Sequence, residues 1–428
     1  MDLDLDLDLG FPGKWRFPTS INNCCIYRVP NSMRSINPEA YTPQLVLLGP
    51  LNYTLISQAS KSRGDITNTK STGYLNMQEY KKIYLKKFTE RATIQLRQET
   101  SIDDFRRKIE GDEKQIRESY SESTAWINPK DFMDMILNDC IFILEHILRV
   151  TLRSVGREVK TGDPLLDVPC LEIRVKKDLI ILENQLPYFV LEKLFKSIYP
   201  NRELGRLVFY YFGLQNEIGN ETEFLHFTDL LRCVRVAKIP KLPPPTEFKY
   251  INMYNAVKLH SGGVKFKVVE NKFPLYARFE DGCLELPCLE VDDGEEMTLR
   301  NIMAFEQCHV PYEAHVCNYI IFLDYLIDNE KDVELLVEKE IIKNSIGQPS
   351  AIAEMVNKLC LGHCYCGSYC ADIADKVTAY YNDPLNKKRA VLKSIYFSNV
   401  WIGTATVAAM LLLLLTLTQT VTSIMQVT

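Results

Sequence analysis

Apolar residues recur every three or four positions along much of this chain, which is the spacing of a helix buried along one face. Three such helices are predicted in the first third of the sequence: over 77–96, from Ser101 to about residue 120, and from Asn128 onward. Ser101 precedes Ile-Asp-Asp, which suits an N-cap followed by an acidic first turn. Asn128 and Pro129 fit an N-cap followed by proline at the first helical position.

The charged residues of these helices should lie in two kinds of surroundings. The first helix carries four lysines that we expect on a solvated face: Lys81, Lys82, Lys86 and Lys87. The third helix is apolar on most faces between Phe132 and Leu148, which predicts a central place in the core. Asp139, Glu145 and His146 lie within that helix and need polar partners if they are buried.

Prolines in the middle of the chain limit where regular helices and strands can form. Pro187 interrupts the apolar run 178–195, where it should kink a helix or begin a new one. Four prolines within 239–246 exclude a regular helix or a central strand. We interpret that segment as a linker or an extended strap between two parts of the chain.

After this segment the pattern becomes mixed. Short β-like runs separated by turn residues predict strands near 263–269, 274–279 and 283–287. Further helices are expected over 297–307, 318–327, 332–342 and 370–381. The predicted fold class is therefore mainly α (α+β): a large helical domain with a small antiparallel β element and one C-terminal transmembrane helix.

The transmembrane helix rests on the strongest apolar signal in the sequence. Val400 to Thr418 is almost entirely apolar, and no charged residue follows Lys393. A helix of this length spans about 28 Å, close to the roughly 30 Å of bilayer hydrocarbon. A core helix of the same length would usually keep a polar stripe. We therefore predict that the side chains in contact with the membrane lipid are those of Trp401, Ile402, Val407, Leu411, Leu412, Leu413, Leu414, Leu415 and Leu417.

The flanks of this helix predict its orientation. Four cations precede it and none follows it: Lys387, Lys388, Arg389 and Lys393. Positive charge stays on the cytoplasmic side, so we expect a single-pass, tail-anchored protein with the bulk of the chain in the cytosol, at the plasma membrane or an endomembrane. The same cations could attract anionic lipid. Small residues four apart would allow homo-oligomer contacts through the helix, at Ala405/Ala409 and Thr404/Ala408.

These signals divide the chain into six predicted parts. The acidic start alternates Asp with Leu and lacks the basic and continuous apolar regions of an export signal, so a flexible tail is expected. The parts are a tail over 1–20, a helical part over 21–238, a Pro-rich linker over 239–247, a β-containing and helical part over 248–393, a transmembrane helix over 395–418, and a short tail over 419–428.

Composition and charge exclude several classes of protein. The chain of 428 residues is 46% hydrophobic and 25% charged, which rules out a mostly disordered or collagen-like protein. Its net charge of −5 disfavours general nucleic-acid binding, which needs a basic field. The phosphate-binding and hydrolase motifs GxxxxGK[ST], GxGxxG, GxSxG and HExxH are missing. We therefore expect no enzyme and no cofactor.

A cysteine cluster is the best metal candidate in the sequence. Thirteen cysteines at irregular spacing fit a reducing compartment. The run CLGHCYCGSYC offers Cys360, His363, Cys364 and Cys370, with Cys366 pointing elsewhere on a helix. Zinc needs four converging N or S ligands, and no second CxxC pair completes a known zinc motif. Zinc binding and S-acylation stay open, and reduced packing cysteines are the reading that we prefer.

Three adjacent polar residues stand between apolar runs and are expected to be buried. They are Glu183, Asn184 and Gln185, between Ile-Ile-Leu and Leu-Pro-Tyr-Phe-Val-Leu. Buried polar groups are costly unless they are hydrogen-bonded. We interpret this polar trio as a structural network that fixes the chain at Pro187, with a ligand site as the alternative.

Several segments together resemble one known family. They are IYRVP at 26–30, AYTPQLVLLGP at 40–50, IILENQLPYFVL at 180–191, AVKLHSGGVKFK at 256–267, FEDGCLELPCLEVDD at 279–293 and LRNIMAFEQC at 299–308. The chain resembles the plant domain-of-unknown-function 247 family, also called the UPF0481 group. It departs from the family pattern after Gly49-Pro50, where Leu51, Asn52 and Tyr53 replace Tyr-His-His, and at Cys140, where glycine is usual.

The resemblance implies a plant protein with membrane attachment and no established enzymatic activity. Some grass members of the family are implicated in self-incompatibility as candidate recognition determinants. We therefore expect a membrane-anchored module that recognises an unknown protein partner. An enzyme with an unfamiliar site, and a soluble interaction protein with a buried C-terminal helix, are the two alternatives.

Overall fold

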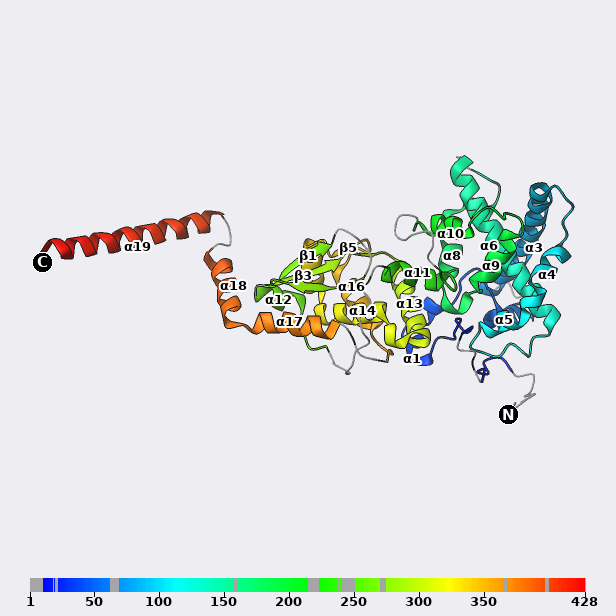
Figure 1. Cartoon of the computed structure of the whole chain (residues 1–428), viewed down its shortest axis with the longest axis horizontal. Helices are drawn as coiled ribbons and strands as arrows, with labels where there is room; N and C mark the ends of the chain where they lie inside the picture. Colours follow the sequence, from blue (N-terminus) through cyan, green and yellow to red (C-terminus); the bar gives the residue numbers. More distant parts are fainter. Residues whose placement is uncertain are drawn as a thin grey trace.

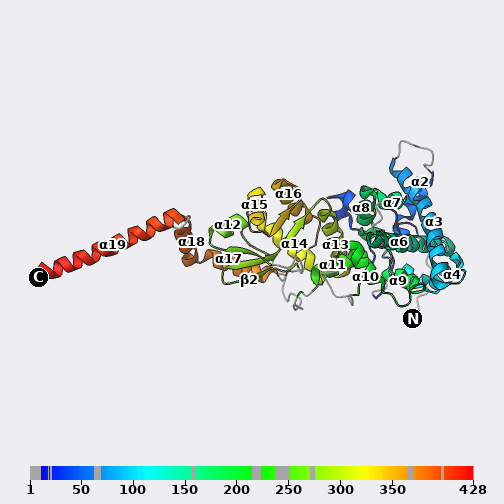
Figure 2. The same ribbon diagram turned by 90° about the horizontal axis from the view of Figure 1, so that it is seen from above.

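The computed structural model describes residues 11–17, 19, 22–61, 69–156, 160–214, 223–237, 239, 251–269, 275–364, 368, 370–396 and 400–427. The chain forms an elongated body, and α18 (Pro384–Tyr396) and α19 (Val400–Val427) lead away from one end of it (Figure 1). Seen from above, the helices of the first half gather at one end, and the strands lie between them and α18 (Figure 2).

Two long helices form the frame of the first half. α3 (Thr69–Leu96) packs along α6 (Pro129–Gly156), and α6 is buried over most of its length. The shorter helices of this half are α1 (Asn31–Arg34), α2 (Tyr53–Lys61), α4 (Ile102–Ile109), α5 (Glu113–Glu118), α7 (Pro164–Asp167), α8 (Pro169–Asp178), α9 (Tyr188–Lys196) and α10 (Leu204–Phe212). Single 3₁₀ turns cover Pro38–Tyr41, Pro50–Asn52, Glu110–Asp112 and Leu182–Asn184.

Local capping chemistry sets several of these helix ends, as the sequence predicts. The Ser101 hydroxyl accepts from the Asp104 N–H, and the Asp104 carboxylate accepts from the Ser101 N–H, which is a full capping box. The Asn128 side chain accepts from the Asp131 N–H at 2.9 Å, one residue before α6 begins. Pro187 precedes α9 and ends the preceding segment, so the prediction of a new helix at this proline is confirmed.

One prediction about the first helix is wrong. Lys82, Lys86 and Lys87 are exposed as expected, but Lys81 is buried. Its ammonium group lies 2.5 Å from the Asp139 carboxylate of α6. The periodic pattern places residue 81 beside the buried stripe of α3, and the carboxylate on the facing helix allows a lysine to be enclosed there.

The second half combines helices with two small sheets. Its helices are α11 (Phe227–Val236), α12 (Ala256–Ser261), α13 (Glu295–His309), α14 (His315–Leu326), α15 (Glu330–Glu338), α16 (Pro349–Leu359) and α17 (Cys370–Asn382), and a 3₁₀ turn covers Pro311–Glu313. Its strands are β1 (Lys265–Val269), β2 (Arg278–Glu280), β3 (Cys283–Pro287), β4 (Leu289–Val291) and β5 (Ile342–Asn344).

The α-rich fold class is confirmed, but the expectation of a small antiparallel β element holds only for the pairing of β2 with β3. β3 pairs antiparallel with β2 but parallel with β1, and β4 pairs parallel with β5. The sequence pattern identifies strands and not their partners, since β4 and β5 are paired although they lie about fifty residues apart in the chain.

A tight hairpin joins β2 to β3 and is covered by α17. Asp281 and Gly282 both have positive φ and connect the paired residues Glu280 and Cys283, which is a two-residue turn of the Asp-Gly type. Glycine is required at 282 for a second reason, because a Cβ there would collide with the ring of Tyr380 on α17. α17 is thereby held against the sheet.

One continuous hydrophobic core runs through both halves. It contains residues from Cys25 to Val377, and α11 packs on α13 and α14. The division into parts at 239–247 stays a prediction, because of that segment only Ile239 is described. Of the predicted N-terminal tail, residues 1–10 are outside the described residues, and Trp15 pairs with Glu122 through their backbones.

Candidate functional site

α19 is the most exposed apolar element among the described residues. Its stretch Thr404–Met425 contains 22 residues, and none of it is buried against the body. At 1.5 Å per residue this stretch measures about 33 Å, close to the roughly 30 Å of bilayer hydrocarbon. Leu411 to Leu415 are each more than half exposed. The helix is therefore long and apolar enough to cross a membrane.

The bounds of α19 differ from the predicted transmembrane helix over 395–418 at both ends, because residues 395 and 396 belong to α18 and α19 begins at Val400. The helix continues to Val427, so most of the residues expected as a short tail are helical. Thr416, Thr418, Thr420 and Thr422 donate their hydroxyl protons to helix carbonyls one turn earlier, which makes them compatible with lipid. The side chains of Trp401 and Ile402 are outside the described residues, and Val407 and Leu417 are exposed.

The predicted flanking cations lie on α18. Lys387, Lys388 and Arg389 are exposed, and the Lys387 ammonium lies 4.5 Å from the centre of the Tyr381 ring. The side chain of Lys393 is outside the described residues. α18 thus carries its basic residues directly before the apolar helix.

The polar trio lies buried at the centre of the body. The Asn184 side-chain oxygen accepts from the Leu48 N–H at 2.7 Å and from the Asn52 amide at 3.0 Å. Its side-chain nitrogen donates to the carbonyls of Val46 and Asp178, both at 2.9 Å. A single side chain therefore holds the segment around residue 47 against the end of α8 and the end of the 3₁₀ turn at 182–184.

Glu183 binds the N-terminal segment. One carboxylate oxygen accepts from the Val29 N–H at 2.6 Å and lies 2.5 Å from the Arg34 guanidinium. The other oxygen lies 2.9 Å from Arg28, which also pairs with Glu122. Two guanidinium groups and a backbone N–H balance this buried charge, as buried carboxylates require.

Gln185 completes the network with backbone groups. Its nitrogen donates to the carbonyls of Leu179 and Ile181 at 2.7 and 2.8 Å, and its side-chain oxygen accepts from the Phe227 N–H at 3.0 Å. Every side-chain nitrogen and oxygen atom of the trio therefore has a protein partner.

Asn301 extends the same network to α13. Its side-chain oxygen accepts from the Leu182 N–H at 2.9 Å, and its nitrogen donates to the Ala40 carbonyl at 2.8 Å. Four of the segments that carry the family resemblance, 26–30, 40–50, 180–191 and 299–308, thus meet in one buried polar cluster.

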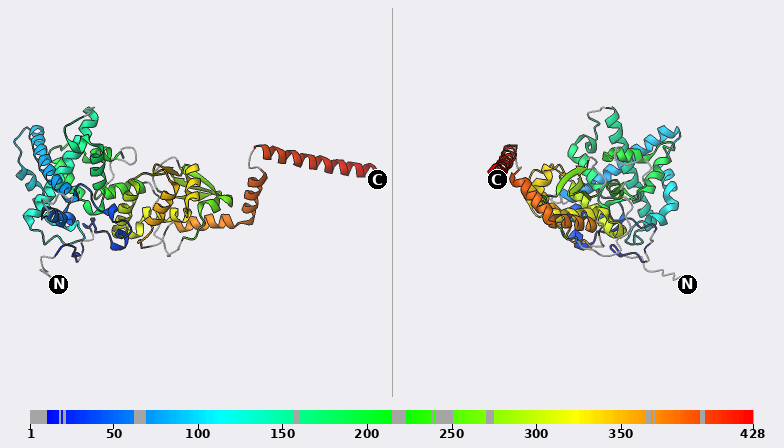
Figure 3. Two further views of the ribbon diagram at one scale, coloured as in Figure 1. Left: turned by 180° about the vertical axis from the view of Figure 1, so that it is seen from behind. Right: turned by 60° about the vertical axis from the view of Figure 1, so that its left-hand side comes forward.

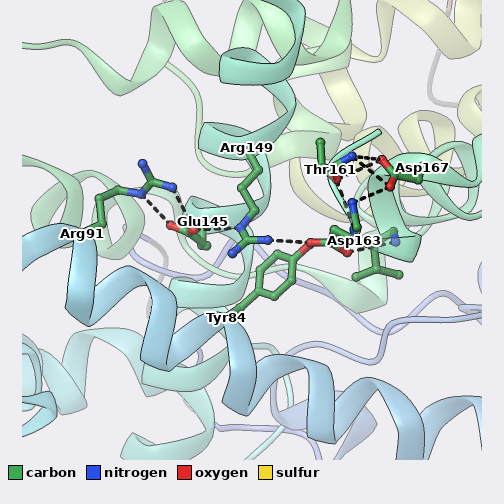
Figure 4. A network of polar contacts seen from close by, with 9 residues as sticks. Tyr84, Arg91, Glu145, Arg149, Thr161, Asp163 and Asp167 are labelled. Atoms are coloured by element: carbon green, nitrogen blue, oxygen red, sulfur yellow. Dashed lines mark hydrogen bonds and ion pairs between the residues drawn. The ribbon is translucent and has the colours of Figure 1, made fainter. Parts of the chain in front are cut away.

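A second polar network fastens α3 and α6 to the segment before α7 (Figure 4). Glu145 of α6 accepts from Arg91 and from Arg149, and Arg149 also reaches Asp163. The Tyr84 hydroxyl donates to the same Asp163 carboxylate at 2.8 Å. Burial and the neighbouring Asp163 raise the pKa of Tyr84, so its hydroxyl stays protonated as a donor.

His146 is a buried polar residue that these networks do not include. Its ring stacks on Phe142, and its two nitrogens have no hydrogen-bond partner among the described residues. Burial lowers the pKa of His146 from 6.5 to about 4, so the ring is neutral in the folded body at neutral pH.

Among the described residues the cysteine cluster does not form a metal site. Cys360 ends α16 and is half-buried, Cys364 is exposed, and Cys370 is buried at the start of α17. His363 contacts the Leu361 carbonyl through Nδ1. No group of three or more potential ligands converges in the part of the chain that the structure describes, and Cys366 is outside it.

A cavity of about 560 Å³ lies between α8 and α10 on one side and β4 and α13 on the other. Its apolar lining includes Phe212, Leu231 and Leu289, and Arg235 pairs with Glu295 at 2.9 Å in its wall. The half-buried Lys176 also lines it, with its ammonium 5.8 Å from the centre of the Phe212 ring. Burial lowers the pKa of this lysine.

Asp139 and Gly49 form a buried hydrogen bond that the sequence analysis did not predict. The Gly49 N–H donates to the Asp139 carboxylate at 2.8 Å, opposite the Lys81 ammonium. Both residues flank positions at which the chain departs from its family pattern. Asp139 was recognised as needing a partner, but no local signal connects it with residues ninety positions earlier.

The fold and this site define an α-rich protein with a buried polar cluster and one exposed apolar helix. The family model DUF247, described as plant protein of unknown function, matches residues 26–415. The chain therefore belongs to this family, as the sequence motifs indicate.

Two curated relatives agree with this assignment. A UPF0481 protein of Arabidopsis thaliana is 27% identical over 440 residues, which cover 94% of this chain and 87% of that protein. A second Arabidopsis thaliana protein of the UPF0481 group is 28% identical over 160 residues, which cover 37% of this chain and 30% of that protein. No solved structure matches the chain.

Proposed function

We propose that this chain is a single-pass membrane protein whose helical body recognises a protein partner on the cytosolic side. The exposure of Thr404–Met425 supports the anchor most directly. Removing a leucine side chain from water contributes about 1.5 to 3 kcal/mol, so five adjacent exposed leucines favour transfer into lipid strongly. This argument weighs against a soluble protein with a buried C-terminal helix.

The basic residues of α18 support the proposed orientation. They stand on the side of α19 that faces the body, directly before the apolar helix. The body therefore stays in the cytosol and the end of α19 crosses the membrane. Thr404 and Ala408 lie on the surface of α19 one turn apart, which fits pairing of two copies through small residues.

Membrane fractionation tests the anchor. The full chain should resist extraction by alkaline carbonate and require detergent. Leu413→Arg with Leu414→Arg should release it, because each arginine at the bilayer centre costs about 2.5 to 3.5 kcal/mol. Leu361→Arg is the matched control, since Leu361 is an exposed leucine of the body. Carbonate extraction of the unmodified chain would contradict the proposal.

Proximity labelling in plant tissue tests recognition. The full chain is compared with an unrelated soluble protein that carries only residues 383–428. Proteins labelled by the full chain and not by this control are the expected partners. Identical labelled sets would show that the body recognises nothing and would favour another role.

A second candidate function is ligand binding or catalysis in the cavity beside Lys176. An amine whose pKa is lowered by an apolar pocket is a more reactive nucleophile at neutral pH. Trace labelling of the full chain with acetic anhydride should then modify Lys176 faster than the exposed Lys193. Equal or slower modification would remove the support for this candidate.

A further inference from the structure

α18 exposes an apolar face that no described part of the body covers. Its large apolar residues Leu385, Val391, Leu392 and Ile395 are each at least half exposed. At about 100° per residue they fall within one arc of roughly 120° around the helix. At the same 100° per residue, Lys388 lies in the middle of this arc and Arg389 lies about 40° beyond its edge, and both are exposed.

The opposite face of α18 is fastened to the body. The Asn386 amide donates to the Tyr380 carbonyl of α17 at 3.2 Å, and Ala390 lies against Gly263, where an added Cβ would meet it at 3.1 Å. The Asp383 carboxylate accepts from the Leu385 N–H at 2.8 Å and caps the helix. The rotation of α18 about its axis is therefore set by the body, and its apolar arc must face outward.

The direction of α18 fits a surface that α19 crosses. In Figure 1 α18 runs crosswise to α19, and the view from behind in Figure 3 shows the same crossing, with the body on the far side of α18 from the end of α19. If α19 crosses the bilayer along its normal, α18 lies along the bilayer surface.

We propose that α18 is an interfacial helix that lies on the cytosolic surface of the membrane. Its apolar arc enters the boundary between headgroups and acyl chains, and Lys388 and Arg389 bind anionic headgroups. This inference rests on the proposed membrane anchor and adds a fixed orientation to it. The sheet and α17 then stand next to the membrane, and the helices α3 to α6 point away from it.

Hydrogen exchange of the full chain in lipid nanodiscs tests this orientation. In discs that contain phosphatidylserine, the amides of α18 should exchange slowly, as those of α19 do. Leu392→Glu with Ile395→Glu should speed exchange in α18 at least tenfold and leave α19 protected. Ile83→Glu with Ile94→Glu is the matched control, because these exposed residues of α3 lie at the far end of the body and should change nothing in α18.

The lipid dependence tests the headgroup contacts. Discs of phosphatidylcholine alone should speed exchange in α18 roughly thirtyfold, because each of the two cations contributes about 1 kcal/mol at an anionic surface and about 1.4 kcal/mol corresponds to a factor of ten. The same protection in both lipids would overturn the role of Lys388 and Arg389. Rapid exchange in α18 beside a protected α19 would overturn the interfacial helix alone, whereas an unprotected α19 would overturn the anchor itself.

Discussion

Replacing Asn184 by alanine tests whether the polar trio is structural. The Asn184 side chain is 1% exposed and makes four hydrogen bonds, two through its oxygen and two through its nitrogen. The Asn52 amide keeps the Leu48 and Glu183 carbonyls as partners after the change. The Asp178 carbonyl keeps the Ile181 N–H.

Two backbone groups would lose their only described partner. They are the Leu48 N–H and the Val46 carbonyl. A buried polar group left without a partner costs about 1 to 3 kcal/mol, so Asn184→Ala should reduce the free energy of unfolding by roughly 2 to 6 kcal/mol. Because domains are stable by only about 5 to 15 kcal/mol, a loss of this size is large.

Urea denaturation of the full chain in mild detergent, followed by circular dichroism, measures this loss. Asn382→Ala is the matched control, because Asn382 is exposed at the end of α17 and should change stability by less than about 0.5 kcal/mol. If Asn184→Ala unfolds within 1 kcal/mol of the unmodified chain, the trio does not support the fold. If stability is kept and partner labelling is lost, the trio is a binding site.

Three further predictions concern other buried groups. His146 should make the body acid-sensitive, because the pKa of this histidine is about 4 in the folded chain and 6.5 in the unfolded chain. Below pH 6.5 the unfolded chain therefore binds a proton that the folded chain does not. The free energy of unfolding should then fall by about 1.4 kcal/mol per pH unit down to pH 4. In His146→Phe the dependence of the urea midpoint on pH should be flatter. Lys81→Met should cost about 3 to 5 kcal/mol, because the buried Asp139 carboxylate loses its counter-charge and keeps the Gly49 N–H as a neutral donor, and a double-mutant cycle with Asp139→Asn should recover part of this loss. Gly49→Ala should lower the thermal midpoint, because residue 49 has a φ of 70° and a Cβ there would lie 2.9 Å from a carbonyl oxygen. Gly73→Ala is the control and should raise the thermal midpoint, because Gly73 lies within α3 and a Cβ there would meet no other atom within 4 Å.

The sequence was informative wherever structure depends on neighbours along the chain. The cap at Ser101, the start of α6 after Asn128 and the new helix after Pro187 all follow from side chains within a few residues. The start of α3 at Thr69, eight residues before the predicted start, was missed. Its first two turns carry few apolar residues, so periodicity alone gives no signal there.

Long-range pairing is the part that local patterns could not provide. Strand composition indicates β1 and β3 but contains nothing that makes their pairing parallel. Burial of Glu183 and Asn184 could be expected from their apolar neighbours. Their partners Val29 and Leu48 could not, because they lie more than 130 residues away and contribute only backbone N–H groups.

The place of the family motifs inside the body limits where recognition can occur. Val29, Leu48, Asn184 and Asn301 come from four different motifs, and each is at most 1% exposed. Their polar atoms are used in bonds between motifs, so these four residues serve the fold and are not available to a partner. We therefore expect the proposed partner to contact other, exposed residues of the body. Substitutions on the exposed surface, made in a body that still unfolds at the normal urea concentration, are the changes that can separate recognition from folding.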